Sequence, residues 1–424
     1  MFYTVIRLLL GALFLFSGWV KAIDPAGLSY KIAEYGASFG MPWLDDVATP
    51  FATILCALEL FLGLMMFFKL WQKVVSVATF LFMLFFTIIT LLIMILPDVS
   101  VKECGCFGDA ILLTNTQTFY KNIVILLFAF LYARHVFISS LNSNNKYYYD
   151  TGFMSRRKKC QLKFLRLVVY LYILGFSFAI PLYSIFYLPP YTYLPYDIGE
   201  NIIQTGNNTS SDEVKTKLIY ENIASGEKRT FDIDDTEWQD DTKWKYIDTE
   251  TSGGSSNQTV GTLAIYNQEK ENVTKELLGQ QGYTFLVITH DINELNYHEI
   301  NNLESLLKLR KGKKIELVVV TTTPIESAKM KLSTLGWGNV EVYNCDLVEL
   351  KSLLRDKSGV VLIKDGIISG KWNFKGNILK NISYNDLQPL IDWERNTIIF
   401  FFIIVGLFMA VMLYLIIEYH RTRR

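Results

Sequence analysis

Two cysteines, Cys104 and Cys106, lie one residue apart in the segment 103–109 (ECGCFGD), between apolar runs at 74–96 and 119–138. A Cys-x-Cys pair can form a strained disulfide, bind a soft metal ion, or exchange thiol and disulfide with another protein. A bond across one glycine closes a small ring, and strain makes a disulfide a better oxidant. We therefore predict Cys104 and Cys106 as a catalytic redox pair. The alternative is a static disulfide, or two buried thiols, that pins the loop.

The chain has three other cysteines, Cys56, Cys160 and Cys345, and five in all are too few for a disulfide scaffold. No metal is expected at Cys104 and Cys106, because two ligands do not make a closed site and no histidine lies nearby in sequence. Cys345 is expected on the same side of the membrane as this pair. It is either a thiol partner that forms a mixed disulfide with the pair or a small buried residue.

Six apolar runs have the length of about 20 residues that spans a bilayer. They cover residues 3–22, 48–68, 74–96, 119–139, 164–188 and 397–417. The first run lacks a small-x-small cleavage site and is predicted to be an uncleaved anchor. The formal net charge is zero, which gives no support to nucleic-acid binding. The sequence therefore predicts a multi-pass α-helical membrane protein surrounded by the lipid bilayer.

Lysine and arginine gather at one set of span ends, for example in residues 69–73, 156–159 and 421–424, whereas the opposite short loops carry four lysines. Because cytoplasmic loops hold the excess of basic residues, we expect both termini in the cytoplasm. The loop 103–109 and the polar region 190–395 then lie on the other side. The predicted location is the bacterial cytoplasmic (inner) membrane, with the polar region in the periplasm.

The polar region divides by composition into two parts. Residues 191–256 predict a small β-rich segment, and residues 251–257, rich in glycine and serine, predict a flexible linker. From 258 to 390, strand and helix patterns alternate, with buried-strand runs at 283–289 and 315–321. This order predicts a three-layer α/β domain.

The element order over 280–380, which ends in a hairpin turn at 365–366, resembles the thioredoxin fold. That fold carries Cys-x-x-Cys after its first buried strand, at a helix start where the helix dipole lowers the thiol pKa. Here residues 289–294 (THDINE) contain no cysteine, and residues 358–359 (SG) replace the proline that usually precedes the late strand. The resemblance implies a thioredoxin-like domain that binds or positions a partner and does not itself exchange disulfides.

In the membrane part, Arg7, residues 16–21 (FSGWVK), Glu59 and the loop 103–108 look like the DoxX/MauE-like family of small bacterial membrane proteins. The chain is similar to the long variant that appends an outer thioredoxin-like domain. The resemblance covers about residues 1–140, and the Cys-Gly-Cys-Phe-Gly sequence is its specific part. It implies a four-helix core, and its MauE branch implies thiol chemistry in the cell envelope.

Three ionisable residues fall within the first two spans or at their ends: Arg7, Lys21 and Glu59. A charge inside a bilayer is costly and usually faces the bundle interior with a partner. Glu59 is predicted either to pair with Arg7 or to form a proton or quinone-headgroup site, so a quinone is one option for a cofactor that the sequence leaves unknown. Lys21 either stabilises a thiolate of the cysteine pair or extends to the membrane surface.

The predicted organisation, in chain order, is a DoxX/MauE-like four-helix membrane domain (1–140), a basic cytoplasmic loop (141–163), a fifth membrane helix (164–188), the β-rich segment (191–256), the thioredoxin-like domain (258–390) and a sixth membrane helix (397–417). The predicted function is thiol–disulfide redox chemistry, or maturation of periplasmic client proteins, through the Cys-Gly-Cys loop. If the protein is an enzyme, the predicted class is a membrane thiol–disulfide oxidoreductase. The alternative is a non-enzymatic scaffold or assembly factor whose thioredoxin-like domain binds partners and whose cysteines are a structural staple.

Overall fold

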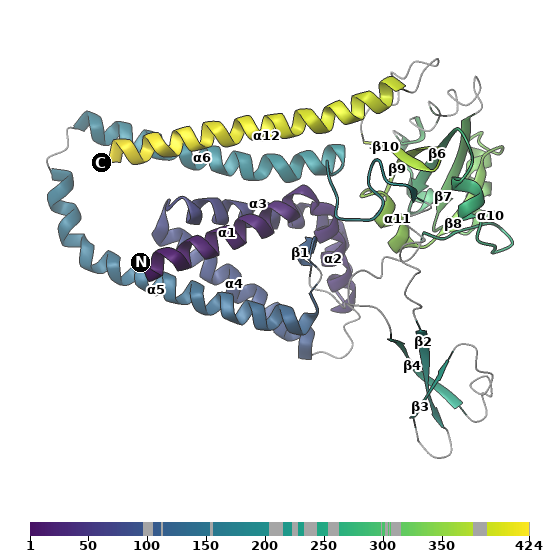
Figure 1. The fold of residues 1–424 in the computed structure, drawn as a ribbon, viewed down its shortest axis with the longest axis horizontal. Coiled ribbons are helices and arrows are strands. Elements are labelled where there is room, and N and C mark those ends of the chain that lie inside the picture. Colours follow the sequence, from purple (N-terminus) through teal and green to yellow (C-terminus); the bar gives the residue numbers. More distant parts are fainter. Residues whose placement is uncertain are drawn as a thin grey trace.

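A computed structural model shows a bundle of long helices with an α/β domain at one end (Figure 1). The structure describes residues 1–95, 105–111, 113–152, 156–202, 215–222, 228–232, 244–252, 263–297, 299–301, 304, 306, 315–375 and 388–423. The long helices are α1 (Phe2–Ile23), α3 (Leu44–Phe67), α4 (Gln72–Ile95), α5 (Asn115–Gly152), α6 (Arg156–Tyr187) and α12 (Gln388–Arg423). Each contains a segment of 22 to 28 residues that is apolar enough to cross a membrane. The six predicted spans are therefore confirmed.

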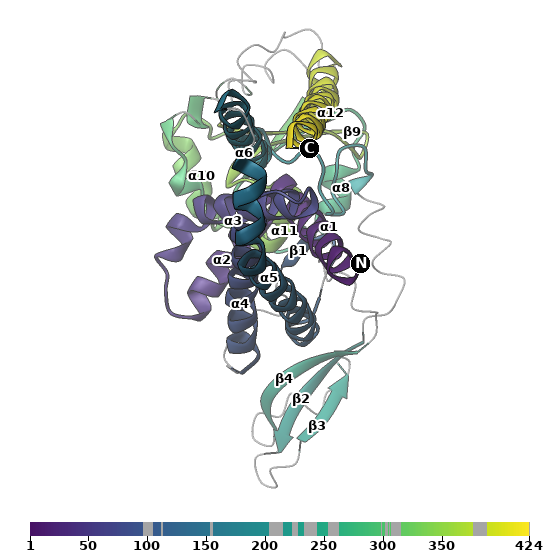
Figure 2. The same cartoon turned by 90° about the vertical axis from the view of Figure 1, so that its left-hand side faces the viewer.

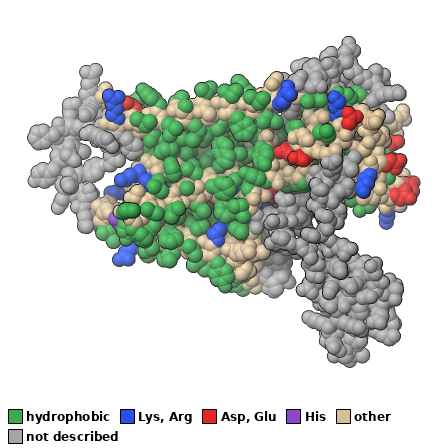
Figure 3. Space-filling view, viewed as in Figure 1, with side chains coloured by type: hydrophobic (Ala, Val, Ile, Leu, Met, Phe, Trp, Pro, Cys, Tyr) green, Lys and Arg blue, Asp and Glu red, His purple; other side chains and the backbone are tan. Residues whose placement is uncertain are grey.

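Apolar side chains cover the outside of the bundle, while charged side chains gather at its two ends (Figure 3). Leu127 of α5 and Leu407 of α12, for example, are more than half exposed, as lipid-facing residues must be. Both chain termini lie at one end of the bundle and the α/β domain lies at the other (Figure 1). The helices thus present a hydrophobic band between two polar ends.

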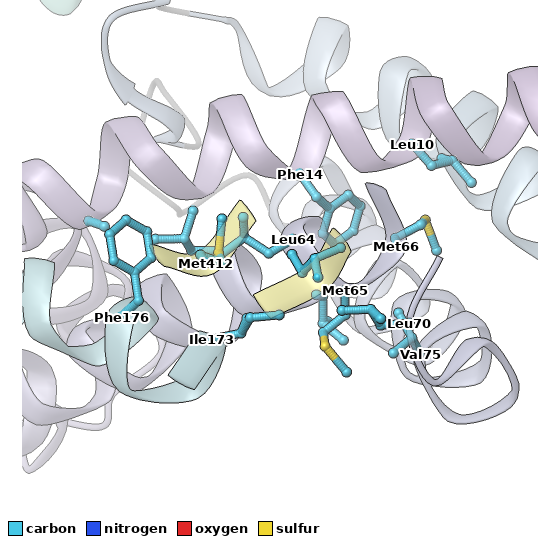
Figure 4. Close-up of a cluster of buried hydrophobic side chains, with 14 of the residues drawn as sticks. Leu10, Phe14, Leu64, Met65, Met66, Leu70, Val75, Ile173, Phe176 and Met412 are labelled. Atoms are coloured by element: carbon cyan, nitrogen blue, oxygen red, sulfur yellow. The ribbon is translucent and has the colours of Figure 1, made fainter. Parts of the chain in front are cut away.

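Glycines let α1 and α3 pack closely in an antiparallel pair. Gly18 faces the backbone of Leu60, and Gly63 faces the backbone of Leu15; a Cβ added to either glycine would lie 2.6 Å from backbone nitrogen. Small residues of this kind allow membrane helices to approach each other. Apolar side chains of α1, α3, α6 and α12 meet beside this pair in one buried cluster (Figure 4).

The segment between α5 and α6 differs from the loop predicted at 141–163. Helix α5 continues to Gly152, and α6 already begins at Arg156. Arginine and lysine have helix propensities close to the best, so the run at 156–159 extends α6 beyond its apolar part. The predicted spans at 119–139 and 164–188 are therefore parts of longer helices.

Two short elements cover the end of the bundle that faces the α/β domain. Helix α2 (Pro25–Ser38) begins directly after α1, with proline in its first turn and Asp24 as its N-cap; the Asp24 carboxylate accepts a hydrogen bond of 3.2 Å from the Gly27 amide. Strand β1 (Cys106–Asp109) precedes α5 and packs against α1 and α2. Together they form the platform on which the candidate site is built.

The α/β domain contains a six-stranded sheet in the order β10-β9-β6-β7-β8-β5. Its strands are β5 (Ile265–Tyr266), β6 (Tyr283–Thr289), β7 (Ile315–Thr321), β8 (Glu341–Cys345), β9 (Ser358–Lys364) and β10 (Ile367–Asn373). Its helical elements are α8 (Thr274–Leu278), η2 (Ile292–Glu294), α10 (Ile325–Thr334) and α11 (Leu347–Leu353). Strands β6, β7 and β8 run parallel, and β9 pairs antiparallel with both β6 and β10.

Buried cores lie on both faces of this sheet. Phe285 and Leu286, adjacent residues of β6, enter opposite cores because successive strand side chains alternate. Ala328 of α10 lies in one core and Leu350 of α11 in the other, so helices cover both faces. This confirms the predicted three-layer, thioredoxin-like α/β fold. The hairpin turn predicted at 365–366 is also present, with positive φ at both residues.

A separate three-stranded sheet precedes the α/β domain in the chain. It consists of β2 (Lys215–Asn222), β3 (Lys228–Asp232) and β4 (Trp244–Ser252), all antiparallel and in the order β3-β2-β4. Both views show it extending away from the helices (Figures 1 and 2). It corresponds to the predicted β-rich segment. The linker predicted at 251–257 lies largely outside the described residues.

Candidate functional site

A buried ion pair joins α1 and α3 near the end that faces the α/β domain. Lys21 contacts the carboxylate of Glu59, and both side chains are less than a tenth exposed. The glycine contacts set this register, because Gly18 opposite Leu60 places Glu59 within one helical turn of Lys21. Two opposite charges that neutralise each other can be accommodated inside a membrane protein, whereas one alone is costly.

The predicted pairing of Glu59 with Arg7 is wrong. Arg7 lies at the other end of α1, where its guanidinium donates a hydrogen bond of 2.7 Å to the carbonyl of Met66 and a second to that of Phe67. These carbonyls belong to the last turn of α3, whose acceptors have no partner within the helix. Arg7 therefore binds the end of helix α3. The prediction that Lys21 extends to the membrane surface is also wrong, because its side chain is buried against Glu59.

The cysteine loop is held directly above this ion pair. Gly105 and Gly108 adopt φ of +64° and +56°, a left-handed conformation that glycine accepts without strain, and they bracket Cys106 in a tight turn. The Ser17 hydroxyl donates a hydrogen bond of 2.8 Å to the Cys106 carbonyl. Cys104 lies outside the described residues, so the pairing of the two cysteines stays a prediction.

A small cavity of about 50 Å³ connects the loop with the ion pair. Its apolar walls are mostly leucine and phenylalanine, and its polar lining comes from Ser17, Lys21, Glu59, Cys106, Lys121 and Asn122. Lys21 also interacts electrostatically with Cys106. The space accommodates water, since one water needs about 10–15 Å³, but organic ligands need pockets of about 300 Å³ or more. A quinone ring does not fit here, and we assign no step to one.

The residue after Cys106 fixes the loop against two helices. Phe107 is 8% exposed, and its ring lies 6.0 Å from that of Phe16 in α1. The ammonium group of Lys121 in α5 lies 4.4 Å from the centre of the Phe107 ring, within range for a cation–π contact. These contacts keep the loop on top of the cavity.

The α/β domain reaches this platform through one arginine. Arg355 follows α11, is 9% exposed, and forms ion pairs with Asp24 at the end of α1 and with Asp109 at the end of β1. The bond from Arg355 Nε to the Asp24 carboxylate is 2.9 Å. Burial lowers the pKa of Arg355, but the two carboxylates outweigh it, so the net shift is upward. One guanidinium therefore ties the α/β domain to both α1 and the cysteine loop.

The last residue of β6 and the first residue of β9 lie side by side at one edge of the α/β domain, called here the strand-end edge. Thr289 at the end of β6 pairs with Ser358 at the start of β9, which is where the thioredoxin fold carries its redox site. His290 follows, and its ring centre lies 6.4 Å from that of Tyr30 in α2. Burial and two neighbouring lysines lower the pKa of His290 to about 4, so it is neutral at pH 7.

The other cysteines lie apart from the loop. Cys345 is buried in a core of the α/β domain, and its thiol donates a hydrogen bond of 3.5 Å to the Glu349 carboxylate. Burial, together with that carboxylate, raises the pKa of the Cys345 thiol. These surroundings agree with the alternative that Cys345 is a small buried residue of the core. A mixed disulfide between Cys345 and the loop stays a prediction. Cys56 is buried in α3 and Cys160 is exposed near the start of α6.

The fold and the site thus define a multi-pass membrane protein with an attached thioredoxin-like domain. Residues 1–134 match the family described as methylamine utilisation protein MauE. The chain is also similar to Protein TlpB of Flavobacterium psychrophilum, with 27% identity over 152 residues, which are 35% of this chain and 40% of that protein. The match therefore spans less than half of that relative. No solved structure matches the chain.

Sequence reasoning found Cys106, Lys21 and Glu59 but missed the residues that bring the two domains together. Neither Asp24 nor Arg355 was expected to join the two domains. No local pattern marks either residue, because they are 331 positions apart and meet only after both domains have folded. Ser17 belongs to the FSGWVK motif, so its contact with the loop could have been proposed from that motif.

Proposed function

We propose that this chain is a thiol–disulfide exchange protein of the bacterial cytoplasmic membrane, and that Cys104 and Cys106 are its reactive pair. The observation that carries this proposal is the position of Cys106 beside the buried ammonium group of Lys21, at a cavity of about 50 Å³ that both residues line. A cation next to a sulfur stabilises the thiolate, which is both the nucleophile and the leaving group in disulfide exchange.

The exchange involves the cysteine pair of this chain, two thiols of a client protein as the reductant, and a disulfide of another protein as the oxidant. A client thiolate attacks one sulfur of the Cys104–Cys106 disulfide, and the bond between the pair breaks as a mixed disulfide forms. A second client thiolate then displaces the mixed disulfide. The client loses two electrons and gains a disulfide, and the pair gains two electrons and takes up two protons. Exchange with a disulfide of another protein reverses these bonds and restores the pair.

In this scheme Lys21 and Glu59 act on the sulfur that leaves. The Lys21 ammonium stabilises the Cys106 thiolate, while Glu59 keeps the site neutral before the reaction begins. Ser17 holds the backbone of Cys106, so the sulfur stays next to the cation as its bonds change. Glu59 also faces the same cavity and can exchange a proton with the loop through water.

We further propose that the α/β domain and the cysteine loop face the periplasm and that both termini are cytoplasmic. The termini lie together at the end of the bundle opposite the α/β domain (Figure 1), and the basic runs at 69–73 and 156–159 belong to that end. We propose the division into a DoxX/MauE-like core, two further helices and outer domains as predicted from the sequence, with periplasmic proteins as clients. The MauE match supports the extent of the core.

The redox state of the pair in intact membranes tests the function. Membranes are poised at a series of reducing potentials, alkylated with a membrane-impermeant thiol reagent, and digested, and the mass of peptide 103–121 is measured. We expect the pair to change from disulfide to dithiol as the potential falls, and Cys104→Ser to abolish oxidation of client thiols. Cys160→Ser is the matched control and should change neither result. A pair that stays oxidised at every potential would refute the proposal.

A scaffold or assembly factor is the second candidate. One observation favours it: the strand-end edge of the α/β domain has no cysteine at residues 289–294, so this domain cannot exchange disulfides at that position. In that case Cys104 and Cys106 would staple the loop. Cys104→Ser would then lower the thermal stability of the protein and leave the thiols of envelope proteins unchanged.

A further inference from the structure

The strand-end edge of the α/β domain is occupied by another part of the same chain. We propose that this edge, made of His290, Lys351 and Arg355, is a docking surface for helix α2 and strand β1, with Arg355 as its anchor. The α/β domain would thereby hold the cysteine loop in place, and Arg355 would be a positioning residue for it. The docking itself does not depend on the proposed function. Only its consequence, the control of access to Cys106, rests on the proposed function.

Three contacts meet at Tyr30 of α2, two of them cation–π contacts and one a contact between rings. The Tyr30 ring receives the ammonium group of Lys351 at 4.4 Å from its centre and the guanidinium carbon of Arg355 at 5.9 Å. The His290 ring lies beside it, with centres 6.4 Å apart. Tyr30 is partly buried, and this burial raises the pKa of its hydroxyl. Cation–π contacts gain strength when they are removed from water.

The Arg355 ion pairs fix the position of this surface. Asp24 comes from the junction of α1 and α2, Asp109 comes from the end of β1, and one guanidinium binds both. Gly27 makes room for them, since a Cβ at this position would lie 3.3 Å from the nearest nitrogen of Arg355 and 3.3 Å from the Asp109 carboxylate. Removing one partner from this buried group would leave an uncompensated charge, so substitution of Arg355 should weaken the docking.

The arrangement has a consequence for clients. In a thioredoxin-like fold, the ends of β6 and β9 are the edge at which a redox site meets its substrate, and here this edge faces α2. A client therefore does not bind the α/β domain at that edge while the domain is docked. Asp109 follows Cys106 by three residues, so its bond to Arg355 also holds the cysteine loop against the bundle.

A cross-linking experiment on the full-length chain in membranes tests the docking. Tyr30→Cys and His290→Cys are combined, a specific protease site is inserted at 253–256, and a short bifunctional maleimide joins the two new thiols. After cleavage, only cross-linked chains keep their two fragments together on a denaturing gel. The two single-cysteine variants give the background caused by the native cysteines.

We expect a strong cross-link in the otherwise unchanged chain and a yield at least tenfold lower after Arg355→Gln. Lys357→Gln is the matched control, because Lys357 lies two residues away but its ion pair with Glu294 is exposed, and it should leave the yield unchanged. Asp109→Asn tests the same bond from the membrane side and serves if Arg355→Gln does not fold. A cross-link at background level, or one insensitive to both substitutions, would overturn the docking.

Labelling of Cys106 in the same variants separates this inference from the proposed function. If the docking holds the loop, Arg355→Gln makes Cys106 react several-fold faster with an impermeant maleimide after mild reduction, whereas Lys357→Gln does not. If the cysteine pair never changes redox state, the proposed function fails and the cross-link still decides the docking. If the pair changes redox state but the cross-link ignores Arg355, the docking alone fails.

Discussion

The Lys21–Glu59 ion pair makes a prediction whose size follows from its burial. Glu59→Gln removes one charge and leaves Lys21 charged inside the bundle, with its side chain only 7% exposed. Breaking a buried pair in this way costs about 3–5 kcal/mol. At about 1.4 kcal/mol per factor of ten, the unfolding equilibrium then shifts by roughly a hundredfold or more. Lys21→Met should cost a similar amount, because it leaves Glu59 unpaired.

Replacing both residues should cost much less than the two single changes together. In Lys21→Met/Glu59→Gln, the uncompensated charge is gone and the methionine fills most of the lysine volume, so most of the loss should be recovered. The assay is unfolding in detergent micelles with increasing SDS, followed by circular dichroism. The matched control is the exposed pair Lys31–Glu34, with an N–O distance of 3.4 Å, where the same substitutions should cost less than about 1 kcal/mol.

The same variants separate the electrostatic role of the pair from a purely structural one. After Glu59→Gln, the Lys21 ammonium has lost its compensating carboxylate and is free to stabilise a thiolate at Cys106. The reduced Cys106 thiol should therefore react faster with a maleimide. After Lys21→Met it should become slower. Loosening of the fold would make both variants faster. Equal effects in both, or additive costs in the double variant, would refute our account of this ion pair.

Three further predictions concern the rest of the molecule. His290 has a pKa of about 4 in the folded protein and about 6.5 in the unfolded chain, so the unfolded chain binds more protons between these two pH values. The free energy of unfolding should therefore be constant above pH 6.5 and fall by at most about 3 kcal/mol as the pH is lowered to 4. Unfolding measured at each pH should show a weaker pH dependence in His290→Gln. Gly18→Ala should destabilise the bundle by about 1–3 kcal/mol in the SDS assay, because its Cβ would meet the backbone of α3, whereas Gly175→Ala in α6, where nothing lies within 4 Å, should cost nothing. Cys345→Ser should lower the melting temperature of the protein, because it places a hydroxyl group in a buried core. It should leave the redox state of peptide 103–121 unchanged. A change in that redox state would instead support a mixed disulfide between Cys345 and the loop.

The elements that the sequence predicted well are those whose signal is local. A membrane span needs only length and apolar composition, and all six were found for that reason. The strand at 283–289 was recognised because a continuous apolar run buried on both faces is typical of a central strand. Errors came where a second local signal was underweighted, as at 141–163, where basic residues favour helix as well as marking the end of a span.

The partner of Glu59 was misjudged because charge alone does not set the register of two helices. Arg7 and Lys21 are both cations on α1, and composition offers no reason to prefer either. The choice is made by close packing, since Gly18 and Gly63 allow the helices to approach in only one alignment. The spacing of these glycines was visible in the sequence. Reading it as a contact pattern would have placed Lys21, and not Arg7, level with Glu59.

The contact of Arg355 with Asp24 and Asp109 could not be predicted from either domain alone, because each domain supplies only part of its charges. Two of the charges are carboxylates at the end of the membrane core, and the third is a guanidinium that the α/β domain supplies. The core alone would leave two acids close together at the end that faces the α/β domain, and like charges disfavour each other. Docking of Arg355 supplies one positive charge, which offsets one of these two negative charges. If Cys104 and Cys106 react as proposed, the α/β domain contributes to their surroundings electrostatically, through an arginine that binds Asp109, three residues after Cys106.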